Sequence, residues 1–505
     1  MSNPTIQVHP ADNVVIAVRK LAAGETIWPG ITARMEIPQG HKAALRAMET
    51  GEAVIRYGVC LGYLLHPVSP GDWIGEHDLR PAPAPDLDKL AWGTHLCSME
   101  ELPLPTCTTF WGYPTADGRA GTRNLLGIVT TVQCAAGVAQ QAAERIRSQL
   151  LPRYPHVEDV VVIVPPYGCG VAIDAPEAKV PIRTIRGLIH HPNFAGEALV
   201  VSLGCEKLTP ERVMDPEEIC DENRVVLQAC RGYEAMLEAI CQRAERKLER
   251  LEQRRRQELP LGMLTVGLQC GGSDAFSGMT GNPAVGYAAD MLVRAGATVM
   301  FSENSEVRDG AQQLAARIPD RETCRRLQEE LAWCDRYLEE GGVDRTANPT
   351  PGNKAGGLSN IVEKAMGSIA KSGTSPIVEV IGTGERPTRH GMIYAATPAN
   401  DMICGTSQMA SGIGLQVFIT GRGTPYNLQA IPVIKVGTRT DLKEQWFDLI
   451  DVDAGTIATG QEDITQVGTR IFQLIVDVAS GRAKTFADRH RIYNDAYVFN
   501  PAPIT

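Results

Sequence analysis

The feature that most constrains the fold is a series of short apolar runs, each ending in a loop of small or polar residues. Five such runs follow residue 260: MLTVGLQCGGSD, ATVMFSENSE, PIVEVIGTGE, LQVFITGRGTP and AIPVIKVGT. Continuous apolar runs of this length, separated by longer segments, predict buried parallel strands. We therefore expect residues 260–505 to form an α/β domain with its site at the carboxyl ends of the strands.

The same alternation occurs earlier in the chain, between residues 110 and 259. The runs LLGIVTTV, VVVIVPP and ALVVSLG each end in a loop of small residues, which predicts a middle α/β domain with parallel strands. Residues 229–258 carry an amphipathic pattern that ends in a cluster of charges. This pattern predicts one long helix with a solvated, connecting role.

The first 82 residues follow a different pattern. Alternating apolar positions and closely spaced glycine and proline residues predict a small all-β domain over residues 1–82. Residues 83–109 are rich in proline and lack a period, which predicts an extended linker. A chain of 505 residues is long enough for the three domains that these patterns indicate.

Composition and charge exclude several classes of protein. The formal net charge of -10, with no concentrated basic block, argues against nucleic acid as a partner. No apolar run approaches the ~18–20 residues that cross a bilayer. The first residues, MSNPTIQVHP, do not resemble a secretion signal, so we expect a cytoplasmic protein. In a reducing compartment, the 13 cysteines are expected to be thiols or metal ligands rather than disulfides.

Four cysteines stand at or just after predicted strands, beside small residues: Cys134, Cys169, Cys205 and Cys270. Strand ends converge in space, so together these thiols suggest a site, although each taken singly is more often a buried small residue. The spacing includes no CxxC pair, so a closed zinc site is not indicated. Thiolates at such a place suit either a single metal ion or an iron–sulfur cluster, and the sequence leaves both open.

The loop of residues 269–290 places Ser273, Asp274 and Asn282 before a helix expected near Pro283. Free backbone amides at a helix start favour an anion. The loop matches neither the dinucleotide fingerprint nor the phosphate-loop signature, so no nucleotide cofactor is expected.

Two further polar loops supply fixed cations, Lys354 and Arg422, which could bind a small carboxylate. A dicarboxylate would need two such groups. Glu303 and Glu306 follow another predicted strand and suit a divalent ion or proton transfer, with surface capping as the alternative.

Many long motifs occur in the order found in one enzyme family. They include VHPADNV, IPQGHKAAL, FWGYPTADGRAGTRNLLGI, YGCGVAIDAP, LGCEKL, QCGGSDAFSGMTGNPAVGYAADMLVRAGATVMFSE, NPTPGNKAGGLSNIVEKAMGSIAKSG, FITGRGTPYN, DAGTIATG and FNPAPIT. On these motifs the chain resembles the galactarate and altronate dehydratase family along nearly its whole length. The resemblance implies an N-terminal β-clip (antifreeze-like) domain, a middle dimerisation domain and a C-terminal Rossmann-like domain with altered topology.

The resemblance also implies a reaction. A metal-dependent hydro-lyase of this family would dehydrate galactarate, a six-carbon sugar dicarboxylate, to 5-dehydro-4-deoxy-D-glucarate. The implied cofactor is a divalent metal, with iron(II) the usual activator and manganese(II) or magnesium(II) as alternatives. A homodimer is expected, with no nucleic-acid or membrane partner.

The resemblance and the loops together assign roles to particular residues. The metal-side residues are Cys270, Asp274, Cys169 and Glu303. The catalytic residues are Lys354, Glu303 and Tyr167. The substrate-binding residues are His9, Asp12, Asn13, Ser273, Asn282, Arg422 and Thr424.

Three positions depart from the family pattern. Pro165 stands where family members carry a histidine, Tyr493 replaces a second histidine, and Asn427 replaces a glycine. A proline side chain can neither ligate a metal nor transfer a proton. These departures leave open a dehydratase for a related acid such as altronate or glucarate, or a weakly active sugar-acid-binding homologue. A nicotinamide oxidoreductase is disfavoured because the dinucleotide fingerprint is missing.

Overall fold

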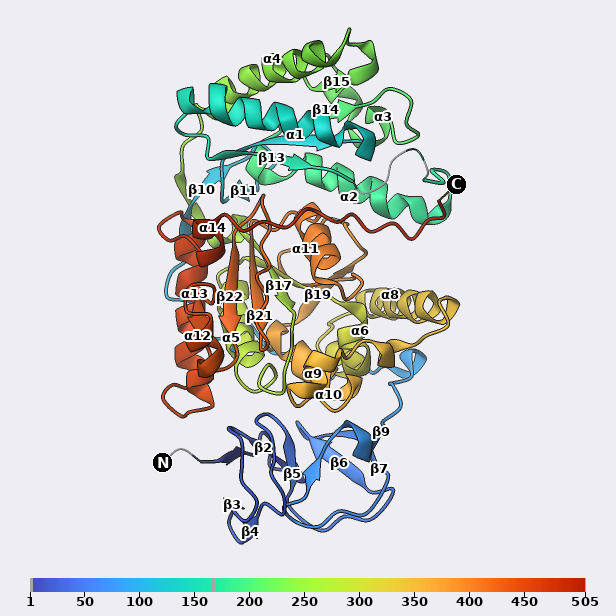
Figure 1. Cartoon of the computed structure of the whole chain (residues 1–505), viewed down its shortest axis with the longest axis vertical. Coiled ribbons are helices and arrows are strands. Elements are labelled where there is room, and N and C mark those ends of the chain that lie inside the picture. Colours follow the sequence, from blue (N-terminus) through green and yellow to red (C-terminus); the bar gives the residue numbers. More distant parts are fainter. Residues whose placement is uncertain (1–2, 166–168, 170, 505) are drawn as a thin grey trace.

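The computed structural model describes residues 3–165, 169 and 171–504. Figure 1 shows three bodies stacked along the long axis, with the β unit of residues 3–82 at one end and the unit of residues 110–259 at the other. The unit of residues 260–504 lies between them. We call these the N-terminal, middle and C-terminal units. No helix in the described part of the chain is long and apolar enough to cross a membrane.

The N-terminal unit is built from short antiparallel strands, which confirms the expected β fold. One sheet has the order β1-β2-β5-β8, a second has the order β6-β7-β9, and β3 pairs with β4. The strands are β1 (Thr5–Ile6), β2 (Val14–Ala17), β3 (Thr26–Trp28), β4 (Ile31–Thr32), β5 (Lys42–Ala44), β6 (Ala53–Arg56), β7 (Val59–Leu64), β8 (Trp73–Ile74) and β9 (Leu79–Pro81).

The segment after β9 runs along the C-terminal unit toward the middle unit. Its regular structure is one 3-10 turn, Leu87–Lys89. Ala91 exchanges two hydrogen bonds of 3.0 Å with the Gln312 side chain, and Arg308 donates to the Pro85 carbonyl at 2.9 Å. The proline-rich segment is therefore extended, as expected, and is fastened to the unit that it crosses.

The middle unit contains a parallel sheet, as the sequence predicts. Its strand order is β13-β12-β14-β15, and every pair is parallel. The elements are β12 (Leu125–Thr130), α1 (Ala136–Arg145), β13 (Asp159–Ile163), α2 (Lys179–Ile189), β14 (Leu199–Ser202), α3 (Pro210–Val213), β15 (Arg224–Val226) and α4 (Tyr233–Leu251).

The helix predicted over residues 229–258 is shorter in the structure, because it ends at Leu251. The following residues form β16 (Gln257–Pro260), which pairs with β10 (Thr109–Pro114), and β10 also pairs with β11 (Ala120–Gly121). Arg256, expected on the charged helix end, donates to the carbonyls of Trp111 and Thr122 at 2.7 and 2.6 Å. Pairing of the entering and leaving strands therefore overrides the helical pattern.

The C-terminal unit contains a seven-stranded parallel sheet with the order β19-β20-β18-β17-β21-β22-β23. All five apolar runs of the sequence form strands of this sheet, and β20 and β23 were not expected. The strands are β17 (Thr265–Cys270), β18 (Thr298–Phe301), β19 (Ile377–Ile381), β20 (Gly391–Ala395), β21 (Leu415–Thr420), β22 (Val433–Gly437) and β23 (Val452–Asp453).

The helices of this unit lie on both faces of the sheet (Figure 1). They are α5 (Gly281–Arg294), α6 (Asn304–Val307), α7 (Ala311–Ala316), α8 (Arg321–Glu340), α9 (Pro351–Ala355), α10 (Ile361–Ile369), α11 (Asp401–Ala410), α12 (Thr440–Gln445), α13 (Ile464–Ala479) and α14 (Phe486–His490). The first strand, β17, lies between β18 and β21, so the chain winds outward from it in both directions. Such a reversal opens a crevice at the carboxyl ends of the strands, and Cys270 is the last residue of β17.

The middle and C-terminal units share one hydrophobic cluster. It includes Val129 and Phe194 from the middle unit and Ile393 and Phe418 from the C-terminal unit. The chain end adds a second connection, since Ala172 donates to the Pro503 carbonyl at 3.0 Å. Figure 1 shows this C-terminal tail crossing to α2.

The N-terminal unit is fastened to the C-terminal unit by a buried ion triad of Lys42, Arg56 and Glu363. Lys42 Nζ lies 3.0 and 2.8 Å from the two oxygens of Glu363, and Arg56 contacts the same carboxylate. All three side chains are inaccessible to solvent. Burial alone would raise the pKa of Glu363, but Lys42 and Arg56 lower it to about 2. The carboxylate is therefore charged at neutral pH.

We expect Glu363→Gln to cost about 3–5 kcal/mol of unfolding free energy, because it leaves two buried cations without an anion. Urea titration of the purified protein measures this. Glu36→Gln is the matched control, since Glu36 pairs with Lys20 on the surface, where both side chains are more than half exposed. Its cost should stay below about 0.5 kcal/mol. Equal costs for the two variants would contradict the role given to the triad.

The same triad predicts a dependence on acid. The pKa of Glu363 is lower in the folded protein than the usual value of 4.5, so its stabilising effect is complete above that value. It is lost as the pH falls from about 4.5 toward 2. Thermal unfolding measured across this range should therefore show a steeper loss of stability for the wild type than for Glu363→Gln. Parallel curves would mean that Glu363 is not the group that titrates.

Candidate active site

Three side chains that suit a metal ion meet at the carboxyl end of β17. Cys270 ends that strand, Glu303 follows β18, and Glu306 lies in α6. One ligand atom from each lies within 4.8 Å of the others, and all three residues are buried. We call these residues the Cys270 group. A thiolate with two carboxylates suits a divalent transition metal.

The backbone at Glu303 adopts an unusual conformation. Its φ and ψ angles are +82° and +78°, in the left-handed region that non-glycine residues rarely occupy. Such a conformation costs on the order of 1–3 kcal/mol and persists where the surroundings impose it. Here Asn304 N donates to the Thr397 carbonyl at 2.8 Å. The strained turn directs the Glu303 carboxylate to the end of β17, where it lies 3.4 Å from Cys270 N.

Two buried lysines balance the charge of the Cys270 group. Lys371 Nζ lies 3.2 Å from Cys270 Sγ and 3.1 Å from a Glu303 oxygen. Lys364 Nζ lies 2.8 Å from Glu306. Both ammonium groups have raised pKa values because these acidic neighbours outweigh the effect of burial.

The acidic groups differ in their ionisation. Burial, reinforced by Glu306, raises the pKa of Glu303 to about 8, and burial raises the pKa of the Cys270 thiol to about 12. Burial alone would raise the pKa of Glu306, but Lys364 and Lys371 lower it. Nearby, burial and then the charge of Glu306 raise the pKa of Asp401 to about 6. A carboxyl group in this range can transfer protons at neutral pH.

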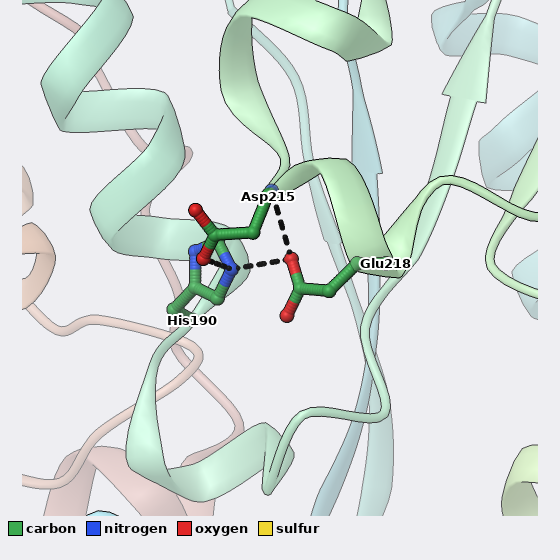
Figure 2. A group of neighbouring side chains, drawn as sticks. All are labelled: His190, Asp215 and Glu218. Atoms are coloured by element: carbon green, nitrogen blue, oxygen red, sulfur yellow. Dashed lines mark hydrogen bonds and ion pairs between the residues drawn. The ribbon is translucent and has the colours of Figure 1, made fainter.

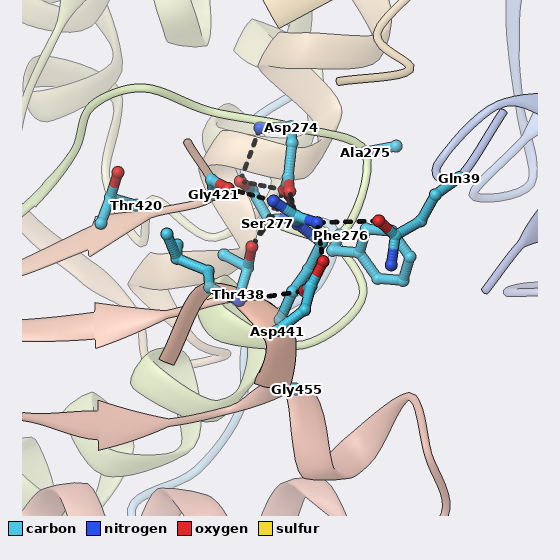
Figure 3. A network of polar contacts seen from close by, with 12 residues as sticks. Gln39, Asp274, Ala275, Phe276, Ser277, Thr420, Gly421, Thr438, Asp441 and Gly455 are labelled. Atoms are coloured by element: carbon cyan, nitrogen blue, oxygen red, sulfur yellow. Dashed lines mark hydrogen bonds and ion pairs between the residues drawn. The ribbon is translucent and has the colours of Figure 1, made fainter. Parts of the chain in front are cut away.

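Asp274, an expected metal-side residue, lies in a separate network (Figure 3). Its carboxylate accepts hydrogen bonds from Arg439 Nε at 3.1 Å and from the hydroxyls of Thr438 and Ser277. Arg439 also donates to Gln39 of the N-terminal unit at 2.8 Å. Gly421 must lack a side chain here, because a Cβ would overlap the carboxylate. These contacts give Asp274 partners other than a metal.

Asp274 and Cys270 nevertheless border the same small cavity. Its lining also includes Ser273, Asn282 and Tyr57. The structure therefore brings together four of the residues singled out in the sequence: Cys270, Ser273, Asp274 and Asn282. Glu303 joins them through its contacts with Cys270 and Lys371.

His9, Asp12 and Asn13 contact the backbone of their own unit. Asp12 accepts hydrogen bonds from His9 N and Gly58 N at 3.0 and 2.9 Å. Asn13 donates to the Ala53 carbonyl and accepts from Ile55 N, both at 2.8 Å. These residues hold the turn that carries Tyr57. Their expected role in substrate binding stays a prediction.

Lys354 lies in a wide cleft between the N-terminal and C-terminal units. The cleft has a volume of about 800 Å³ and is also lined by His41, Trp73 and Glu76. Lys354 Nζ lies 2.5 Å from Glu76 and the side chain is 41% exposed. Leu358 lines both this cleft and the small cavity. Lys354 is thus at the outer approach to the site rather than beside Cys270.

The remaining expected residues do not line the small cavity. Arg422 is exposed and Thr424 is partly buried, next to Gly272 in the loop after β17. Cys134, Cys169 and Cys205 are exposed in the middle unit, apart from the buried Cys270. Tyr167 lies outside the described residues.

The departures from the family pattern also lie elsewhere. Pro165 is buried in the middle unit. Tyr493 lines a pocket with Arg123 and Asp488, and Asn427 donates to Asp488 and to the Ile492 carbonyl at 3.2 and 2.8 Å. None of these three residues is among the described residues that line the small cavity.

Sequence reasoning missed Lys364, Ser368 and Lys371. Their spacing of four and three residues places them on one helical face, a signal that was available in the motif NIVEKAMGSIAKSG. Tyr57 was missed as well. No sequence pattern indicates Tyr57, because the docking of a separate unit brings this residue to the site.

A second group of possible ligands lies on the surface of the middle unit: His190, Asp215 and Glu218 (Figure 2). His190 Nε2 lies 2.7 Å from Glu218, and Arg186 contacts Asp215. Glu218 also accepts from Asp215 N at 3.1 Å and caps the 3-10 turn Pro216–Glu218. These contacts explain the group as an ion network that fastens the turn to α2.

The comparisons with known proteins cover almost the whole chain. Three family models match: "Altronate/galactarate dehydratase SAF domain" at residues 3–82, "D-galactarate dehydratase/Altronate hydrolase, second domain" at 112–252, and "D-galactarate/Altronate dehydratase, C-terminal" at 261–504.

Curated relatives agree with the family models. Galactarate dehydratase (L-threo-forming) of Escherichia coli K12 is 53% identical, covering 99% of this chain and 97% of the relative. Altronate dehydratase of Bacillus subtilis 168 is 31% identical, covering 94% and 95%. The (2R)-sulfolactate sulfo-lyase subunit beta of Chromohalobacter salexigens is 29% identical, covering 74% and 93%. The chain therefore belongs to the galactarate/altronate dehydratase family.

Proposed function

We propose that this protein dehydrates galactarate to 5-dehydro-4-deoxy-D-glucarate with the help of a divalent metal ion. The observation that carries the proposal is the 53% identity, over nearly both whole chains, to a galactarate dehydratase. The identity to altronate dehydratases is much lower, at 31% and 30%. Galactarate is therefore favoured over altronate as the substrate.

We assign metal binding to the Cys270 group, because it offers a thiol and two carboxyl groups within 4.8 Å of one another in a buried place. A bound ion would act as a Lewis acid that stabilises the negative charge developing at the substrate carboxylate. Lys371 and Lys364 hold the ligand side chains in position and offset their charge. Asp274 and Cys169, the other two expected ligands, remain secondary candidates for the metal.

Proton transfer is assigned to carboxyl groups of the C-terminal unit. Asp401 has a pKa of about 6 and its carboxylate packs against Gly271, next to Cys270. It is suited to take the proton beside the substrate carboxylate. Glu303, with its raised pKa, is the alternative. We propose that Lys354 and Arg422 bind substrate carboxylates at the approach to the site. Thr424, in the same loop as Arg422, is proposed to bind the substrate as well.

Finer features follow the family assignment as proposals. We propose iron(II) as the metal, with manganese(II) or magnesium(II) as alternatives, and a homodimer formed through the middle unit. We further propose a Rossmann-like domain at residues 260–505 and a cytoplasmic location. The four-part division at residues 82, 109 and 259 is proposed as the domain organisation.

We expect the purified protein, assayed without oxygen and with iron(II), to form a 2-keto acid from galactarate and little from altronate or glucarate. A chelator should remove the activity, and added iron(II) should restore it. Absence of product from all three acids, with folded and metal-loaded protein, would contradict the proposed function. Tight galactarate binding without turnover would favour the sugar-acid-binding alternative.

Cobalt(II) tests the metal ligands independently of activity. Because a cysteine thiolate is an expected ligand, cobalt(II) should give the protein a thiolate charge-transfer absorption band. Cys270→Ser should abolish the band. Cys324→Ser is the matched control, since Cys324 is an equally buried thiol in α8. A band that survives Cys270→Ser would exclude Cys270 as a ligand.

A further inference from the structure

The small cavity beside Cys270 contains three polar atoms with no hydrogen-bond partner in the described part of the chain. They are the hydroxyl oxygens of Tyr57 and Ser273 and the amide oxygen of Asn282. Ser273 and Asn282 are 4% and 1% exposed. The space, about 10 Å³, admits roughly one water molecule, so the three atoms converge on one small group. Buried polar atoms without partners are rare, so a small group that forms hydrogen bonds, a water molecule or a substrate hydroxyl, completes this place.

The backbone and the neighbours of Tyr57 direct its side chain from the N-terminal unit into the cavity. Its backbone has a positive φ of +58°, and Arg56 stacks 4.5 Å from the centre of its ring. A Cβ on Gly278 would overlap the Tyr57 hydroxyl, so the absence of a side chain there admits it. Gly58, the residue after Tyr57, is held by Asp12, whose carboxylate accepts a hydrogen bond from Gly58 N at 2.9 Å.

The orientation of Asn282 decides which chemical group fits. Its Nδ2 donates to the Gly367 carbonyl at 2.8 Å, so Oδ1 is the atom that faces the cavity as an acceptor. Oδ1 therefore needs a hydrogen-bond donor. The Tyr57 hydroxyl can donate, because burial raises the pKa of this phenol to about 12 and it stays protonated at neutral pH.

A substrate carboxylate cannot satisfy this set, since an ionised carboxylate only accepts hydrogen bonds. An alcohol hydroxyl can, because it donates to Asn282 and accepts from Tyr57 or Ser273. We propose that these three residues form a subsite for one hydroxyl group of the sugar acid, and that Tyr57 is a substrate-contacting residue supplied by the N-terminal unit. This inference rests on the proposed function.

The rest of the substrate lies beyond Leu358. The cavity alone cannot contain a six-carbon acid, but Leu358 lines both this cavity and the wide cleft in which Lys354 lies. In this proposal, displacement of the Leu358 side chain joins the two spaces. One substrate hydroxyl then sits among Tyr57, Ser273 and Asn282, and a remote carboxylate extends toward Lys354.

Tyr57→Phe tests the subsite, because it removes the hydroxyl and keeps the ring. We expect kcat/KM for galactarate, and the affinity measured by calorimetry, to fall about tenfold, the effect of losing one hydrogen bond in a buried place. Tyr63→Phe is the matched control in the same unit, where the ring contacts Arg80 on the adjacent strand β9, and both values should stay within twofold of wild type. Ser273→Ala should reproduce the loss, and replaces Tyr57→Phe if that variant has a lower thermal unfolding midpoint.

The outcomes separate this inference from the proposed function. An active wild type with unchanged values in Tyr57→Phe and Ser273→Ala overturns the subsite and leaves the function standing. A tenfold loss in both variants, with Tyr63→Phe unchanged, supports it. A wild type that neither binds nor converts galactarate overturns both.

Discussion

The arrangement of the site depends on the burial of one carboxylate between two cations from another unit. Glu363 lies in α10, whereas Lys42 and Arg56 belong to β5 and β6. Three buried charges are tolerated because each has an opposite partner and further hydrogen bonds: Lys42 donates to the Gly357 carbonyl and Arg56 to the Ala275 carbonyl, both at 2.8 Å. These carbonyls belong to the loops that enclose the cavity. The docked N-terminal unit therefore completes the enclosure of the cavity.

Helix α10 connects this docking to the chemistry. Glu363 binds the N-terminal unit, while the next residue, Lys364, pairs with Glu306 of the Cys270 group. One and two turns further on, Ser368 and Lys371 contact Cys270. The helix begins at Asn360, which caps it and donates to the Leu61 carbonyl of the N-terminal unit at 3.0 Å. A shift of the N-terminal unit would thus be transmitted to the residues that hold the Cys270 group in place.

Sequence patterns predicted what depends on local periodicity. The apolar runs predicted most strands of both parallel sheets, though not β15, β20 or β23, and the cysteine that ends β17 was found because strand ends converge. Asp274 was found too, but its partner Arg439 lies 165 residues away, so its ion pair could not be foreseen. The role of Tyr57 could not be predicted for a similar reason, since only the docked N-terminal unit places this residue at the same cavity as Cys270. The helix predicted over residues 229–258 was too long, because strand pairing at Gln257–Pro260 competes with the local helical propensity.

The energetics of the docking indicate how a substrate enters. Separating the N-terminal unit from α10 would break the ion pairs of Glu363, the hydrogen bonds of Lys42 and Arg56 to carbonyls of the C-terminal unit, and the packing of Leu61 against Ile361 and Val362. Moving Leu358 breaks only apolar contacts, and a fully buried leucine contributes about 1.5–3 kcal/mol by burial. Entry past Leu358 from the wide cleft is the less costly route, and it leaves Tyr57 and the Cys270 group in place. The N-terminal unit then acts as a fixed wall of the active site rather than as a lid, and the hydroxyl subsite is formed before the substrate arrives.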